Sequence, residues 1–153
     1  MTQLPHTALV TGGSAGIGAD ICQRLLDEGY QVISLARRAP DWSHPRLVSL
    51  NVDLLDAAAT RQAAQEVAAR FAVTHFIHNA GVIWPHLLQD ATVDELQGLT
   101  QIHLGAALTL MQAVLPSMEQ GGFGRVVLMS SRGALGLATR TNYSATKAGM
   151  IGM

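Results

Sequence analysis

Short apolar runs alternate along the chain with longer segments in which apolar residues recur at helical spacing. The short runs predict five strands, at residues 7–10, 32–35, 47–50, around 76–77 and at 126–129. The longer segments predict helices from the glycines at 16–18 to Gly29, over 57–71, over 94–118 and from about 142. Strands and helices that alternate in this way form parallel sheets with right-handed crossovers and helices on both faces. The predicted fold class is α/β, a doubly wound parallel sheet.

The pattern indicates one domain, since no repeat, low-complexity tract or linker divides residues 1–153. The last predicted helix runs from Asn142 to Met153 with no C-cap residue and no basic residue in its final turn. A helix end normally has some device that satisfies its last carbonyl groups. We therefore expect the chain to be truncated inside this helix.

Composition narrows the class of protein. Apolar residues make up 48% of the 153 residues, charged residues make up 14%, and the formal net charge is −1. These values argue against a disordered chain and against a nucleic-acid-binding surface. The single cysteine, Cys22, excludes an intramolecular disulfide and suits a reducing, cytoplasmic location. Residues 1–6 lack the basic start and apolar run of a signal peptide.

The segment from Leu96 to Met118 contains no charged residue and is long enough to cross a bilayer. Glutamine, threonine and histidine side chains interrupt it, and these are costly in hydrocarbon. We therefore expect a helix buried in the core or in a subunit interface and no membrane span. Four apolar residues near one face fit core or dimer packing: Leu104, Leu108, Met111 and Leu115.

A glycine-rich turn, T-G-G-S-A-G-I-G over residues 11–18, joins the first strand to the first helix. Such glycines allow the backbone to approach a phosphate closely, and the helix N-terminus offers free N–H groups and a positive dipole end. The spacing of Gly12, Gly16 and Gly18 is T-G-x-x-x-G-x-G, not G-x-G-x-x-G. Glycine-rich turns also arise for packing alone, so the turn by itself leaves both interpretations open.

The end of the second predicted strand bears on the choice of dinucleotide. An acidic residue there binds the ribose 2′-hydroxyl of NAD(H), whereas a basic residue accepts the 2′-phosphate of NADP(H). The chain has Ala36-Arg37-Arg38 at this point. A charge-assisted contact from Arg37 contributes about 1.5–3 kcal/mol, which favours NADP(H) over NAD(H). The alternative is that both arginines are solvated loop charges.

The only lysine, Lys147, follows one of the two tyrosines, Tyr143, by four residues, while the other nine basic residues are all arginine. On a helix the two side chains share one face, one turn apart. A compact ammonium can bind a cofactor ribose and stabilise a phenolate, which makes the phenol a general acid or base. Ser130 and Ser131 follow the fifth strand, where a hydroxyl can donate to a substrate carbonyl. An incidental helical pair and an ordinary strand-ending turn are the alternatives.

The order of these motifs along the chain resembles that of the short-chain dehydrogenase/reductase family, which has a Rossmann-like fold and a Ser-Tyr-Lys catalytic centre. Residues 11–18 are similar to the family's T-G-x-x-x-G-x-G, residues 79–81 to its N-A-G, and Tyr143-x-x-x-Lys147 to its Y-x-x-x-K. Asp53 falls where the family's adenine-contacting Asp follows the third strand. The resemblance covers the whole chain.

The resemblance implies an NADP(H)-dependent oxidoreductase that interconverts a carbonyl and an alcohol by hydride transfer. Tyr143 is implied as the proton donor or acceptor, and Lys147 as the group that holds the nicotinamide ribose. Ser131 is implied to orient the substrate carbonyl, and Ser130 remains an alternative because the interval from Ser131 to Tyr143 is one residue shorter than usual. The cofactor-binding residues that it implies are Gly12, Ser14, Gly16, Ile17, Gly18, Arg37, Asp53, Leu54, Asn79, Tyr143 and Lys147.

Two departures from the family pattern affect the expected chemistry. His103 stands where the long helix of the family often carries an Asn that helps to hold the water of a proton relay. An imidazole both donates and accepts hydrogen bonds, so we include His103 among the catalytic residues. The strands and substrate loop that follow the Tyr-Lys helix in the family are missing from this sequence. The substrate therefore cannot be read from it.

No metal site is expected, because His75 and His78 are three residues apart on a strand and point to opposite faces. Cys22, among apolar helix residues, is interpreted as a small core residue. The expected partners are a small carbonyl or alcohol substrate and further copies of the chain. Two alternatives to an active enzyme are a catalytically incomplete nucleotide-binding fragment and a cofactor-sensing interaction protein. The intact Tyr143–Lys147 pair argues against the sensor, which needs no proton donor.

Overall fold

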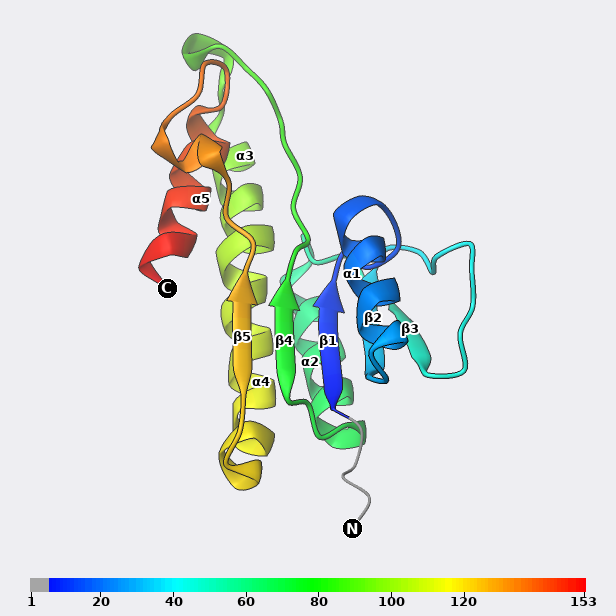
Figure 1. Cartoon of the computed structure of the whole chain (residues 1–153). Helices are drawn as coiled ribbons and strands as arrows, with labels where there is room; N and C mark the ends of the chain where they lie inside the picture. The colour runs from blue at the N-terminus through cyan, green and yellow to red at the C-terminus, as the bar shows by residue number, and fades with distance from the viewer. Residues whose placement is uncertain (1–5) are drawn as a thin grey trace.

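The computed structural model describes residues 6–153; residues 1–5, where no signal peptide is expected, lie outside the described residues. Five parallel strands form one sheet in the order β3-β2-β1-β4-β5 (Figure 1). The strands are β1 Thr7–Thr11, β2 Gln31–Ala36, β3 Leu47–Asn51, β4 His75–His78 and β5 Arg125–Leu128. The predicted α/β class and its parallel sheet are confirmed.

Helices cover both faces of this sheet. The α-helices are α1 Gly16–Asp27, α2 Ala57–Arg70, α3 Val93–Thr100, α4 Ala106–Gly121 and α5 Thr141–Gly152. Two short 3₁₀ turns, Leu88–Asp90 and Arg132–Leu135, lie in the loops that precede α3 and α5. The predicted stop of the first helix is confirmed, because Gly29 takes a φ of +92° and its N–H bonds to the Leu26 carbonyl.

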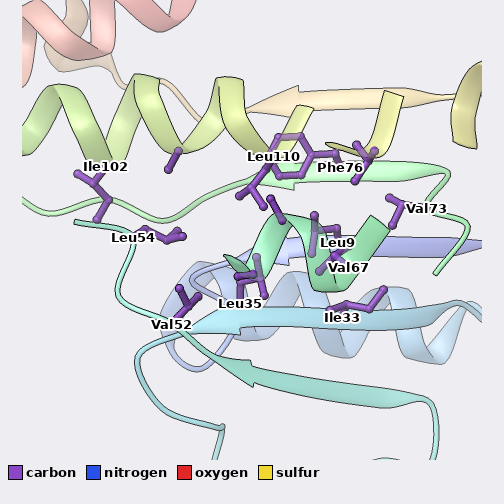
Figure 2. Close-up of a cluster of buried hydrophobic side chains, with 14 of the residues drawn as sticks. Leu9, Ile33, Leu35, Val52, Leu54, Val67, Val73, Phe76, Ile102 and Leu110 are labelled. Carbon is purple, nitrogen blue, oxygen red and sulfur yellow. The ribbon is translucent and has the colours of Figure 1, made fainter. Parts of the chain in front are cut away.

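Two hydrophobic clusters flank the central strands because these strands are buried on both sides. On one face, Leu9, Ile33 and Phe76 of the sheet pack with α2 and α4 through residues such as Val67 and Leu110 (Figure 2). On the other face, α1 packs through Cys22 and Leu26 against Ala8, Val10 and Val32. The interpretation of Cys22 as a core residue is confirmed.

The long helix predicted over 94–118 is not one regular α-helix. A π-helical segment, Gln101–Gly105, separates α3 from α4, and the Ala106 N–H bonds to the Gln101 carbonyl five residues earlier. A π turn rotates the faces of a helix relative to an α-helical count. The core face of α4 consists of Ala106, Ala107, Leu110, Val114 and Met118.

Core or dimer packing was expected for the four residues near one face of this helix, and two of them do not lie in the core, so for these two dimer packing stays a prediction. The side chains of Leu108 and Leu115 are 48% and 49% exposed, while Met111 packs against the core cluster from its edge. The stretch Val93–Gly121 is long and apolar enough to cross a membrane by length and composition alone. Its Leu110 face packs against the sheet and α2, which is how a core helix packs.

Phe76 is fully buried at the centre of the larger cluster (Figure 2). Replacing Phe76 by Ala leaves a cavity that α2 and α4 cannot fill, so we expect the free energy of unfolding to fall by about 3–5 kcal/mol. Leu135, 90% exposed, is the control, and Leu135→Ala is expected to change stability by less than about 0.5 kcal/mol. Urea unfolding of both variants measures the difference, and similar losses would contradict this assignment of the core.

Candidate cofactor and catalytic site

The predicted site residues lie on segments that leave one edge of the sheet. All five strands are parallel, so their carboxyl ends meet at that edge, as the arrowheads of β1, β4 and β5 in Figure 1 show. Chain order reverses between β1 and β4, and this reversal opens a crevice where open α/β sheets bind ligands. The glycine turn follows β1, residues 79–81 follow β4, and Ser130 and Ser131 follow β5.

The glycine turn depends on glycine at three positions. Gly12 and Gly16 have φ values of +70° and +54°, a region that other residues rarely adopt. A Cβ on Gly18 would stand 2.0 Å from the Gly12 carbonyl oxygen, so α1 packs directly on the turn. No side chain caps the N-terminus of α1 at Ala15, and the first N–H groups of this helix remain available to an anion.

Hydrogen bonds tie this turn to the end of β4. The Asn79 side-chain amide donates to the carbonyl oxygens of Thr11 and Gly12 at 3.2 and 3.4 Å. The Thr11 hydroxyl oxygen accepts from the N–H groups of Asn79 and Ala80, both at 3.0 Å. Asn79 therefore holds the shape of the turn, and Thr11 is a positioning residue that the sequence reasoning missed.

His78 links the same hydroxyl to the π segment. Because the Thr11 oxygen already accepts two N–H groups, its proton goes to His78 Nδ1, 2.9 Å away. The Nε2–H then donates to the Ile102 carbonyl at 3.0 Å, and these partners assign the tautomer. Burial lowers the pKa of His78 to about 4, so its imidazole is neutral at neutral pH. The imidazole joins the glycine turn to the long helix.

A cavity of about 130 Å³ opens beside the turn. Its walls include Gly12, Arg37, Asp53 and Leu54, so the structure brings together these predicted cofactor residues from the ends of β1, β2 and β3. Gly81, after β4, also lines the cavity. An adjacent hollow is lined by Ser14, Gly16 and Arg38. The two exposed arginines thus face different hollows, Arg37 with Asp53 and Arg38 with Ser14.

Tyr143 and Lys147 lie one turn apart on α5, as predicted. The Lys147 Nζ stands 5.8 Å from the centroid of the Tyr143 ring. Only 4% of Lys147 is exposed, and its ammonium donates to the Met129 carbonyl at 2.6 Å. Burial lowers the pKa of Lys147 to about 8.

The two serines after β5 have different partners. Ser130 donates its hydroxyl proton to the Lys147 carbonyl at 2.7 Å. The Ser131 hydroxyl accepts from the Gly133 N–H at 3.0 Å, which leaves its own proton for another acceptor. A Cβ on Gly133 would stand 3.3 Å from both Ser131 Oγ and Tyr143 Cε1, so the Ser131 hydroxyl and the Tyr143 ring flank the same small space.

His103 lies against the Tyr143 ring, edge-on, with 5.6 Å between ring centroids. It is fully buried, and Nδ1 lies 2.8 Å from the Thr146 hydroxyl. Burial, followed by the charges of Lys147 and His78, lowers the pKa of His103 to about 3. Thr146 is a second residue that the sequence reasoning missed, because its contact with His103 joins segments 43 residues apart.

The remaining chemistry-bearing residues lie elsewhere. His75 packs with Tyr30 and Phe123 at the opposite, amino-terminal edge of the sheet, far from the contacts of His78. Within residues 6–153 no group of three or more His, Cys, Asp or Glu is placed to hold a metal ion. Burial raises the pKa of the Cys22 thiol to about 11, which makes it a poor nucleophile at neutral pH.

Comparison with known proteins gives one family. The family model described as short chain dehydrogenase matches residues 6–153. The 3-oxoacyl-[acyl-carrier-protein] reductase FabG of Salmonella typhimurium is 31% identical in an alignment that covers 95% of this chain. The alignment covers 63% of that reductase, so the chain spans less than two thirds of the length of this relative.

Solved structures agree with this result. A short-chain dehydrogenase from Streptomyces avermitilis superposes with a TM-score of 0.87 and 33% identity, over 98% of this chain and 58% of that one. A 3-oxoacyl (acyl-carrier-protein) reductase from Agrobacterium tumefaciens C58, with NADP bound, gives a TM-score of 0.83 and 29% identity. That match covers 95% of this chain and 60% of the reductase.

The buried histidines predict acid sensitivity. Burial sets the pKa values of His78 and His103 at about 4 and about 3 in the folded protein, against 6.5 ordinarily. The unfolded chain therefore binds more protons below pH 6.5, and the contribution of these two histidines to stability, which is constant above that pH, decreases as the pH falls toward 4. We expect a loss on the order of 3 kcal/mol from His78 alone. Urea unfolding at pH 7.5 and pH 4.5 measures it, and equal free energies at the two pH values would contradict the neutral histidines.

Proposed function

We propose, from the premise that this chain belongs to the short-chain dehydrogenase family, that it is an NADP(H)-dependent oxidoreductase interconverting a carbonyl and an alcohol. One observation carries the proposal: the only lysine is buried one helical turn from Tyr143, at the sheet edge that bears the glycine turn. The Tyr143 ring flanks the same small space as the Ser131 hydroxyl. Burying an ammonium is costly, and a pair of helix residues with only a structural role does not need one. A proton-transfer site does need a buried positive charge, because the charge stabilises the phenolate.

The residues present fit a dinucleotide. The uncapped N-terminus of α1 and the close packing of Gly18 on Gly12 leave room and N–H groups for a pyrophosphate. In this proposal Gly12, Ser14, Gly16, Ile17 and Gly18 form the pyrophosphate site. Asp53 and Leu54 contact the adenine, Asn79 lies near the adenosine ribose, and Arg37 binds the 2′-phosphate. The reductase from Agrobacterium tumefaciens with NADP bound supports NADP(H) as the cofactor.

The bound cofactor supplies or accepts a hydride at the substrate carbon. The side chains of this chain donate or accept the proton at the substrate oxygen. In the reducing direction the Ser131 hydroxyl donates a hydrogen bond to the carbonyl oxygen, and Tyr143 transfers its phenolic proton to that oxygen. The Lys147 ammonium stabilises the resulting phenolate and binds the nicotinamide ribose. Ser131 is preferred to Ser130 for this role because the Ser130 proton is already given to the Lys147 carbonyl.

A second candidate is nucleotide binding without turnover. The chain spans 63% of the length of FabG. The proposed contacts to the pyrophosphate, the adenosine and the 2′-phosphate come from the segments after β1 to β4, whereas Ser131, Tyr143 and Lys147, which act at the nicotinamide end in the proposal, follow β5. We further propose one domain over residues 1–153, a cytoplasmic location from the single buried Cys22, and a homo-oligomer. The half-exposed Leu108 and Leu115 supply an apolar face for a second copy.

Arg37 sets the cofactor preference in this proposal. We expect NADPH to bind about 10- to 100-fold more tightly than NADH, because a guanidinium pairs with the 2′-phosphate. Arg37→Ala is expected to remove the difference, while Arg38→Ala, whose side chain lines the neighbouring hollow, retains most of it. Calorimetric titration of the three proteins with both nucleotides measures the ratios. Equal affinities in the unmutated protein would refute the preference.

Tyr143 carries the proton transfer in this proposal. Tyr143→Phe is expected to lower turnover of a ketone and aldehyde panel with NADPH by about 10²–10⁴-fold, with NADPH affinity changed only a few-fold. Tyr30→Phe alters the only other tyrosine, which packs at the opposite sheet edge, and should leave turnover unchanged. NADPH binding with no turnover in the unmutated protein would instead support the second candidate.

A further inference from the structure

Two loops that leave the carboxyl edge of the sheet lie side by side, one leading from β4 to α3 and the other from β5 to α5 (Figure 1). The backbone N–H of His86, in the first loop, donates to the Thr139 carbonyl of the second at 3.0 Å. The side-chain amide of Asn142 donates to the Thr92 carbonyl, also at 3.0 Å. Two hydrogen bonds therefore join the start of α5 to the start of α3 and the loop before it.

The imidazole of His86 ties this contact to α3. Its Nε2 lies 2.9 Å from Oε1 of Glu95, and because a carboxylate oxygen only accepts, Nε2 carries the proton. The other carboxylate oxygen of Glu95 accepts from the Thr92 N–H at 3.4 Å, and Thr92 Oγ1 accepts from the Glu95 N–H at 3.2 Å. These side chains and the chain from Thr139 to Asn142 close a ring of hydrogen bonds, which we call the loop latch.

The first turn of α5 depends on contacts from outside the helix. The residue before it, Arg140, makes no side-chain cap hydrogen bond, and helix ends without a cap fray unless other contacts hold them. Among residues 6–153, the two latch bonds are the only hydrogen bonds that join residues 136–142 to another segment. Lys147 bonds to the segment after β5, so the latch holds the start of α5 and Lys147 holds its middle.

Thr139 has a strained backbone conformation in the second loop. Its φ of +62° is the only positive φ at a non-glycine residue in the part of the chain that the structure describes, and β-branched side chains rarely adopt this region. Such a conformation persists only where surrounding contacts fix it. The His86 N–H supplies a contact of this kind at the Thr139 carbonyl. Loss of that bond lets the chain relax four residues before Tyr143.

We propose that His86 is a positioning residue for Tyr143. Its imidazole, bonded to Glu95, anchors the backbone N–H that holds Thr139. The latch thereby fixes the first turn of α5, in which Tyr143 follows Asn142 directly. The side chains of His86 and Glu95 are 39% and 27% exposed, so the pair alone stabilises little, and its effect comes from closing the ring. The catalytic consequence rests on the proposed function of Tyr143, whereas the latch itself does not.

The two tyrosines of the chain report on the latch in the protein without cofactor. With ¹³C-labelled tyrosine rings, His86→Ala and Glu95→Ala should each shift or broaden the Tyr143 signals. The Tyr30 signals should stay unchanged, because Tyr30 packs at the opposite edge of the sheet. Arg24→Ala is the matched control, since it breaks another exposed pair, Arg24 with Glu28 at 2.7 Å, and should move neither set of signals.

Two further variants separate the N–H donor from the aromatic ring at position 86. The amide of a glutamine places an N–H close to the position of Nε2, so His86→Gln should keep the bond to Glu95 and the Tyr143 signals of the unmutated protein. Asparagine is too short to place its amide there, so His86→Asn should resemble His86→Ala. Tyr143 signals that stay unchanged in His86→Ala and Glu95→Ala would overturn the proposal, and so would equal effects of Gln and Asn.

Turnover tests the catalytic consequence. His86→Ala is expected to lower kcat with NADPH about 2- to 5-fold, and His86→Gln to restore it. NADPH affinity should stay the same, because the proposed contacts to the pyrophosphate and the adenosine follow β1 to β4. An unchanged kcat in His86→Ala would refute the positioning role. NADPH binding without turnover in the unmutated protein would contradict the proposed function instead, and the tyrosine signals would still decide on the latch.

Discussion

The burial of one ammonium organises the proposed catalytic side of this molecule. Lys147 makes two hydrogen bonds to the segment that follows β5. Its Nζ donates to the Met129 carbonyl, and its backbone carbonyl accepts from the Ser130 hydroxyl. These bonds fix α5 against the end of the sheet and therefore fix where Tyr143 stands. An ammonium without such partners would not stay buried. The serines, the tyrosine and the imidazole are placed relative to this charge.

Patterns confined to a few neighbouring residues were predictable. Apolar runs located all five strands because parallel strands are buried on both faces. The glycine spacing located the turn, because positive φ at Gly12 and Gly16 and the contact at Gly18 are local needs. The four-residue interval from Tyr143 to Lys147 similarly placed both side chains on one helix face.

Features created by contacts between distant segments were not predictable in the same way. The π segment at Gln101–Gly105 accompanies hydrogen bonds from His78 to the Ile102 carbonyl and from His103 to the Thr146 hydroxyl, which join different elements. A helical count across this segment placed Leu108 and Leu115 on one face for core or dimer packing, and it could not show that they lie half-exposed, outside the core. The roles of Thr11 and Thr146 were also missed, since a threonine hydroxyl shows in sequence neither its partner nor the direction of its bond.

The hydrogen bonds also connect the two halves of the proposed chemistry. From the glycine turn, Thr11 bonds to His78, and His78 bonds to the Ile102 carbonyl. The next residue, His103, bonds to Thr146, which bonds to the Tyr143 carbonyl. His78 donates from Nε2 to the Ile102 carbonyl, whereas the Thr146 hydroxyl, which donates to the Tyr143 carbonyl, leaves His103 to donate from Nδ1. A change in the glycine turn thus has a continuous bonded path to the backbone of Tyr143, and the π segment forms its middle.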